Sequence, residues 1–179
     1  MRNSILRVSA LIMIFAAIFT FVACGNDNDD TPNGMQKLTN EFVDYTLYVP
    51  VSWTADTSNG FISAYTNDKS NVSVLTMTST RVYNTIDEYI DEYLTNLQAT
   101  FADFAYNEEE SVRGQELTLG GKPAARIAYT LTLDGTQYKY LQTIAANGVS
   151  IYTVTYTAIA ENYDAHIDEV YSILDNFKF

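Results

Sequence analysis

Residues 148–179, GVSIYTVTYTAIAENYDAHIDEVYSILDNFKF, carry a β-strand directly into an amphipathic helix. Its first ten residues are mainly β-branched and aromatic, and two-residue alternation places Tyr152, Val154 and Tyr156 on one face of the strand. From residue 167 the apolar residues follow helical spacing, with acidic residues in the first turns, where they suit the helix dipole. The stretch therefore predicts a helix that packs on a sheet.

The sequence before this unit predicts two more strands, at residues 127–133 and 138–144, where apolar residues alternate with polar ones. The dipeptides at 134–135 (Asp-Gly) and 147–148 (Asn-Gly) favour tight turns between antiparallel strands. Together the three strands are predicted to form an antiparallel meander.

Three further strands are expected earlier in the chain, at residues 42–49, 60–66 and 71–80, the first ending at Pro50. The whole pattern indicates an α+β domain with a central antiparallel sheet of about six or seven strands. Residues 104–119 are less regular and receive no assignment.

A long helix is predicted to begin after Thr85, because Thr85 and Glu88 have the spacing of a capping box. Seven apolar residues then form one continuous stripe along it: Ile86, Tyr89, Ile90, Tyr93, Leu94, Leu97 and Phe101. Such periodicity is typical of a helix that packs on a core rather than of a cofactor site.

The N-terminus reads as a targeting segment. Two arginines precede the apolar run 8–23, so residues 1–23 are predicted to be a signal peptide, and residues 21–25 (FVACG) resemble a bacterial lipobox. Residues 24–36 are then a lipidated Cys24 and a flexible tether, and residues 37–179 are a single domain. This predicts a protein held by its lipid on the extracytoplasmic face of the cell envelope. A plain secretory peptide cleaved near residue 23 and an uncleaved anchor are the alternatives.

Composition narrows the function. The chain has 10 basic and 22 acidic residues, a net charge of −12, which disfavours a nucleic-acid partner. Cys24 is its only cysteine, so no intramolecular disulfide can form and the domain must depend on its packed core. The sequence lacks a Gly-x-Ser-x-Gly elbow, a phosphate-binding loop and a zinc ligand set, so we expect neither an enzyme nor a cofactor nor a metal centre.

Four residues are candidate contacts for a partner. Glu108, Glu109 and Glu110 form an acidic run, expected to be a solvated edge or else a metal or partner contact, and Trp53 follows the Pro50 corner. His166, the only histidine, is expected to be exposed near the start of the last helix.

The layout over residues 48–179 resembles the PsbP family, the extrinsic proteins of the oxygen-evolving photosystem and their bacterial PsbP-like relatives. The resemblance lies in residues 48–53 (YVPVSW), in residues 121–126 (GKPAAR), and in 152–156 (YTVTY) running into 173–177 (ILDNF). It implies a central antiparallel sheet with helices packed on both faces, and binding rather than catalysis.

Two classes of function therefore stay open. The first is a lipid-tethered interaction or accessory module that binds an unidentified protein or polymer through a sheet edge or a tyrosine-bearing face. The second is a protein that binds a small ligand or a divalent cation. Calcium binding by residues 27–30 (DNDD) is not expected, because the later glycine and glutamate of a calcium loop are missing.

Overall fold

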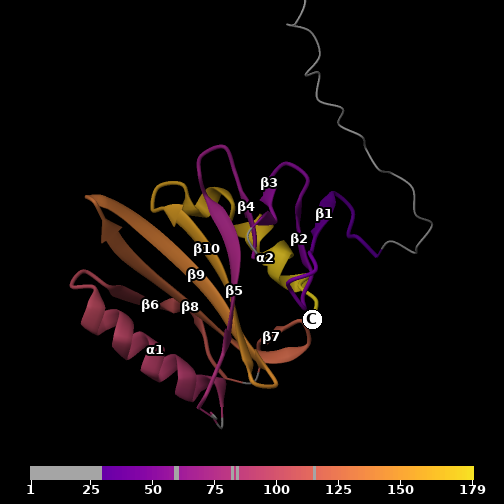
Figure 1. Cartoon of the computed structure of the whole chain (residues 1–179). Helices are drawn as coiled ribbons and strands as arrows, with labels where there is room; N and C mark the ends of the chain where they lie inside the picture. Colours follow the sequence, from indigo (N-terminus) through magenta and orange to yellow (C-terminus); the bar gives the residue numbers. More distant parts are fainter. Residues whose placement is uncertain (1–29, 59–60, 82, 84, 115) are drawn as a thin grey trace, which may run out of the picture. The chain divides into compact units, whose positions relative to one another are not determined.

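The computed structural model describes residues 30–179 except 59–60, 82, 84 and 115, and residues 31–179 form one compact unit (Figure 1). Along the chain the elements are β1 (Met35–Leu38), β2 (Leu47–Pro50), β3 (Thr54–Asp56), β4 (Ile62–Tyr65), β5 (Asn71–Thr78), α1 (Ile86–Thr100), β6 (Ala105–Val112), β7 (Thr118–Leu119), β8 (Lys122–Leu133), β9 (Thr136–Asn147), β10 (Ser150–Ile159), the 3₁₀ turn η2 (Tyr163–Ala165) and α2 (Ile167–Asp175). The predicted leader and Cys24 lie outside the described residues.

The described strands form one large sheet and one small one. The large sheet has eight strands in the order β3-β4-β5-β10-β9-β8-β6, with β7 paired to β8, and β1 and β2 form a separate pair. Every pairing is antiparallel. The predicted total of six or seven strands is too low, because the irregular stretch 104–119 contains β6 and β7 and because β3 has only three residues, too few for alternation to show in the sequence.

The meander of β8, β9 and β10 is confirmed, with one change in a turn. Leu133 pairs with Thr136, so residues 134–135 form the first loop, and both have positive φ. Asn147 pairs with Ser150, which moves the second loop from residues 147–148 to residues 148–149. Gly148, at the first central position with a φ of 65°, suits a type II′ turn.

The predicted cap of α1 is also present. Thr85 is the N-cap, and its hydroxyl accepts a hydrogen bond from the Glu88 amide at 3.3 Å. Ile90 is fully buried, and the rest of the predicted stripe packs in the same hydrophobic cluster. The capping signal and the apolar stripe therefore fix the start and the buried face of α1.

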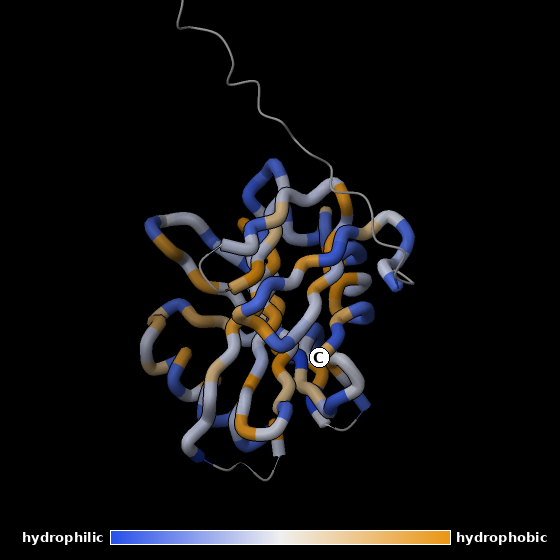
Figure 2. The backbone as a smooth tube through the Cα atoms, turned by 45° about the vertical axis from the view of Figure 1, so that its right-hand side comes forward, coloured by the Kyte–Doolittle hydropathy of each residue, from blue (hydrophilic) through white to orange (hydrophobic). Residues whose placement is uncertain are grey.

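Buried residues fall into two hydrophobic clusters that draw on alternate positions of β8. Ala124 and Ala128 belong to the cluster that contains α2, whereas Ala125, Ile127 and Tyr129 belong to the cluster that contains α1. Hydrophobic segments follow the strands through the interior, while several outer loops are hydrophilic (Figure 2). The described chain is thus mainly antiparallel sheet with two helices, neither of which has the length and apolar character needed to cross a bilayer.

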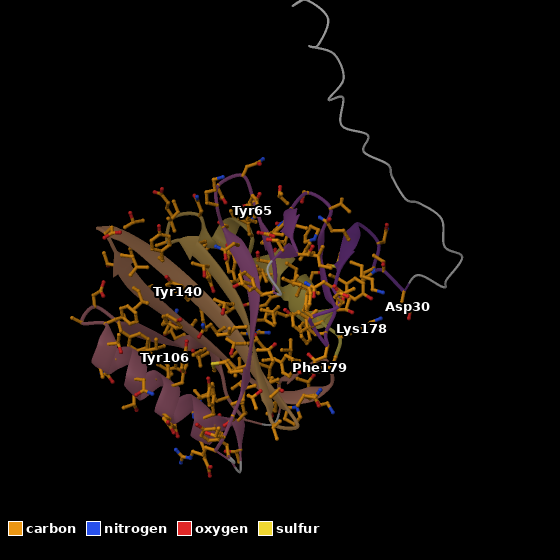
Figure 3. The ribbon with its side chains drawn as sticks, viewed as in Figure 1. Asp30, Tyr65, Tyr106, Tyr140, Lys178 and Phe179 are labelled. Carbon is orange, nitrogen blue, oxygen red and sulfur yellow. The ribbon has the colours of Figure 1, made fainter. Side chains whose placement is uncertain are left out.

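The end of the chain is fastened to the small sheet's side of the domain. Thr46 and Lys178 exchange backbone hydrogen bonds of 2.8 and 3.1 Å, and the centre of the Phe179 ring lies 4.8 Å from that of the Tyr152 ring. Figure 3 labels Lys178 and Phe179. Gly120, with a φ of 56°, lies so close to Phe179 that an added Cβ would come within 2.7 Å of its ring. The last two residues are therefore part of the packed structure.

Candidate functional site

Trp53 lies inside the domain. Its side chain is 3% exposed, and its indole N–H donates a 3.0 Å hydrogen bond to a carboxylate oxygen of Glu169 in α2. The ring meets that of His166 edge to face, with the ring centres 5.7 Å apart. Trp53 therefore joins the β2–β3 corner to the start of α2 and offers no surface to a partner.

The acidic run of β6 is divided between two environments. Glu108 and Glu109 are exposed, whereas Glu110 is half-buried and forms a 2.7 Å ion pair with Lys139 of β9. The Lys139 ammonium also lies 4.0 Å from the centre of the Tyr163 ring. The three carboxylates do not converge, and within the described residues no group of His, Cys, Asp or Glu side chains is arranged to hold a metal ion.

His166 was predicted to be exposed, but only 20% of its side chain is accessible. Its Nδ1 lies 3.1 Å from Glu169 Oε2, and its Nε2 lies 3.1 Å from Asp68 Oδ2. Burial alone would lower the pKa of His166, but the hydrogen bonds and charges of Glu169 and Asp68 outweigh burial and raise it.

Asp68 is the partner of His166 that the sequence did not reveal. It lies in the β4–β5 connection, where the Thr66 hydroxyl and the Ser70 amide both donate to it, and these hydrogen bonds hold its pKa well below the usual range. The sequence marks Asp68 only as part of the turn-forming pair Asn67-Asp68, and 98 residues separate it from His166.

The contacts of His166 with Asp68 and Glu169, called the clamp below, are typical of a structural contact rather than of a reactive centre. When both ring nitrogens are hydrogen-bonded to carboxylates, the imidazole has no free lone pair with which to accept a proton or bind a metal. The two carboxylates also contact different ring nitrogens, so they do not meet at one point. The clamp therefore joins the β4–β5 connection to α2.

The second half of β5, called the open half below, pairs on one side only within the residues that the structure describes. β4 pairs only with residues 71–74, whereas Leu75–Thr78 pair with β10 alone among the described strands (Figure 1). All four of these residues are exposed; Leu75 and Met77 are 57% and 40% accessible. The segment contains neither a charged residue nor a proline, the usual features that keep a free strand edge from pairing.

A pocket of about 530 Å³ lies between the first turns of α1 and the β9–β10 hairpin. The residues that line it come from the β5–α1 connection, the start of α1, the β6–β7 connection, and β8, β9, β10 and the β9–β10 loop: Ser79, Arg81, Tyr83, Thr85, Ile86, Asp87, Tyr89, Gly114, Pro123, Ala146, Gly148, Val149 and Ile151. None of the four sequence-predicted contact residues belongs to this lining.

The pocket and the open half of β5 are neighbours. Met77 is directly opposite Ile151, which lines the pocket, and Leu75 is opposite Thr153 on the same side of the sheet. Exposed apolar residues that gather in this way mark binding surfaces more often than single exposed ones do. This end of the sheet is therefore the candidate functional site.

Solved structures of other proteins are similar to this chain in fold. LpqN of Mycobacterium tuberculosis, described as involved in cell envelope biogenesis, matches with a TM-score of 0.58 at 12% identity, over 82% of this chain and 91% of LpqN. Cyanobacterial PsbP (CyanoP) from Synechocystis sp. PCC 6803 matches with a TM-score of 0.54 at 15% identity, over 86% of this chain and 96% of CyanoP. The chain thus has a PsbP-like fold.

A third similar structure is a protein of unknown function from Pseudomonas aeruginosa, described as a putative regulator. It matches with a TM-score of 0.53 at 14% identity, over 79% of this chain and 94% of that protein. No protein-family model and no curated protein matches the sequence.

Proposed function

We propose that this chain is a lipid-anchored accessory protein of the cell envelope, held by Cys24 on the extracytoplasmic face, that binds an extended segment of a partner protein along the open half of β5. The observation that carries this proposal is the edge of Leu75–Thr78, which pairs only with β10 within the described part of the chain. We propose no catalytic step and no cofactor. The small-ligand alternative belongs to the pocket beside this edge.

The proposal includes a sandwich in which α1 and α2 cover opposite faces of the large sheet, as the PsbP resemblance implies. The two hydrophobic clusters support it, because they take alternate residues of β8 and alternate residues of a strand point to opposite faces. In such a sandwich the helices cover the central strands. Residues 75–78 of β5 are exposed, so their edge is accessible to a partner.

The backbone of an edge strand recognises another backbone. Its free N–H and C=O groups pair with an extended peptide, and alternate side chains of that peptide then meet alternate side chains of the edge. On one side the peptide would meet Leu75 and Met77, which favour apolar residues, and on the other Thr76 and Thr78, which favour polar ones. The expected partner segment therefore alternates apolar and polar residues.

Charge and context support a protein partner in the envelope. The chain carries a net charge of −12, so a partner segment without excess negative charge is favoured and nucleic acid is not. The lipobox-like residues 21–25 support lipid anchoring, and the fold is similar to that of LpqN, a protein described as involved in cell envelope biogenesis.

Site-specific photo-crosslinking in the producing cell tests the proposal. A photoreactive residue in place of Thr76 is expected to give a discrete crosslinked product, whereas the same residue in place of Thr132, exposed near the far end of β8, is expected to give none. Leu75→Lys combined with Met77→Lys should abolish the product, because it places two charges where apolar contacts are required.

The matched control is Val51→Lys with Leu133→Lys, which also places two charges at exposed apolar residues but away from β5. Equal crosslinking at positions 76 and 132, or a product that survives the β5 double substitution, would exclude this edge as the docking site. Thermal unfolding of each variant is measured to check that the fold is retained.

A further inference from the structure

We infer that the pocket between α1 and the β9–β10 hairpin binds a neutral, predominantly apolar small molecule, a ligand distinct from the partner segment on β5. A volume of about 530 Å³ is within the range of small-molecule sites, roughly 300–1,000 Å³. The inference depends on three features of the lining: its apolar walls, its internally paired charges and an exposed apolar residue at its mouth.

The walls are apolar on both sides. α1 contributes Ile86 and Tyr89, and the facing sheet contributes Pro123, Ala146 and Ile151. The Tyr83 and Tyr89 rings meet edge to face, with centres 5.3 Å apart, which fixes the aromatic part of the wall. Burial of apolar surface is therefore the main source of affinity that this site can offer.

The charged groups of the lining are already paired within the protein. The Arg81 guanidinium forms an ion pair with Glu92 and lies 4.9 Å from the centre of the Tyr83 ring. Asp87 pairs with Arg113 at 3.1 Å. A charged ligand would have to compete with these partners, so charge complementarity favours a neutral one.

The Ser79 and Thr85 hydroxyl groups of the lining are engaged as well. Ser79 donates a 2.6 Å hydrogen bond to the Arg81 carbonyl oxygen, and the Thr85 hydroxyl caps α1 by accepting from Glu88. With these groups committed to the protein, few polar contacts are left to demand a matching polar ligand. An apolar ligand would leave none of these groups unsatisfied.

Val149 is the feature that links the pocket to solvent. It occupies the second position of the β9–β10 loop, where polar residues and glycine are usual, and is 69% exposed although it lines the pocket. A bound apolar molecule would cover this side chain. The cost of exposing an isopropyl group in a turn is then offset in the bound state.

Binding of N-phenyl-1-naphthylamine, a neutral apolar fluorophore, to the full chain tests the inference. We expect saturable binding at one site. Ala146→Trp should weaken it by about tenfold or more, because an indole ring fills the volume that the ligand needs. Gln137→Trp, which adds the same ring at an exposed position of β9 outside the lining, should leave binding unchanged.

A second variant tests the pocket in case Ala146→Trp does not fold. Val149→Asp changes an exposed loop residue and should also weaken binding, because it places a charge at the mouth of the pocket. Absence of saturable binding, or equal affinity in both tryptophan variants together with no effect of Val149→Asp, would overturn the inference.

Competition then identifies the source of the ligand. Displacement of the fluorophore by monopalmitoylglycerol below its micellar concentration assigns a neutral lipid, and displacement by naphthalene alone assigns a compact aromatic molecule. Stronger displacement by the palmitate anion than by monopalmitoylglycerol would refute neutrality. The β5 crosslink is measured separately, so failure here and failure of the docking proposal are distinguishable.

Discussion

Replacement of His166 tests the clamp between the β4–β5 connection and α2. His166→Ala removes both hydrogen bonds to Asp68 and Glu169 and leaves these two carboxylates without a cation between them. Hydrogen bonds to charged groups contribute about 1.5–3 kcal/mol each, and partial solvation of all three side chains reduces this. We therefore expect a loss of about 1–3 kcal/mol in the free energy of unfolding near pH 6, whereas replacement of an exposed residue without such contacts would change it by less than about 0.5 kcal/mol.

The pH dependence of this loss follows from the raised pKa of His166. The folded-state pKa lies above the unfolded value of about 6.5, so the protonated clamp is fully stabilising below that pH and its contribution is lost as pH rises through the folded pKa. Urea unfolding of the wild type and His166→Ala at pH 6 and pH 9 should show a gap that shrinks at the higher pH.

His166→Gln is the matched control, because glutamine can still donate to one carboxylate but carries no charge. The difference in the free energy of unfolding between His166→Gln and His166→Ala should be almost the same at pH 6 and at pH 9. The clamp would be refuted by a His166→Ala protein as stable as the wild type at pH 6, or by a gap that does not depend on pH.

Three further predictions concern the core, the C-terminal contact and the anchor. Leu174→Ala should lower the free energy of unfolding by about 2–5 kcal/mol, since Leu174 is 5% exposed, whereas the exposed Asp175→Ala should change it little; equal effects would show that α2 is not packed as described. Gly120→Ala should destabilise the protein more than Gly121→Ala does, as measured by chemical unfolding. Both glycines have a positive φ, which strains other residues by about 1–3 kcal/mol, but only at Gly120 would the new Cβ meet Phe179. Cys24→Ser should release the protein from membranes in cell fractionation while its melting temperature stays unchanged; retention with the membranes would refute lipid anchoring.

The sequence predicted the long periodic elements well. Residues 86–101 combine a capping signal with an apolar stripe, and the three long strands near the end of the chain alternate clearly, so local physics alone identifies them. The shift of the second hairpin loop to residues 148–149 was beyond this reasoning, because register there depends on which residues pair across the whole hairpin.

The His166 clamp and the candidate site could not be predicted for a related reason. Asp68 meets His166 only because the β4–β5 connection lies against the start of α2, and a lone histidine among acidic neighbours gives no sign of this. The pocket likewise combines segments that are distant in the sequence. Trp53 was singled out as an aromatic contact, but the sequence carried no signal that its indole N–H is satisfied internally by Glu169.

The backbone bridge between Thr46 and Lys178 also constrains the order of events in time. Because Lys178 pairs with a residue near the beginning of the domain, this bridge cannot form until residue 178 has left the ribosome. Closing so long a loop is entropically costly and slow compared with forming α1 or the hairpins. A nascent chain should therefore lack the contact between residue 46 and residue 178 until the segment around residue 178 has emerged.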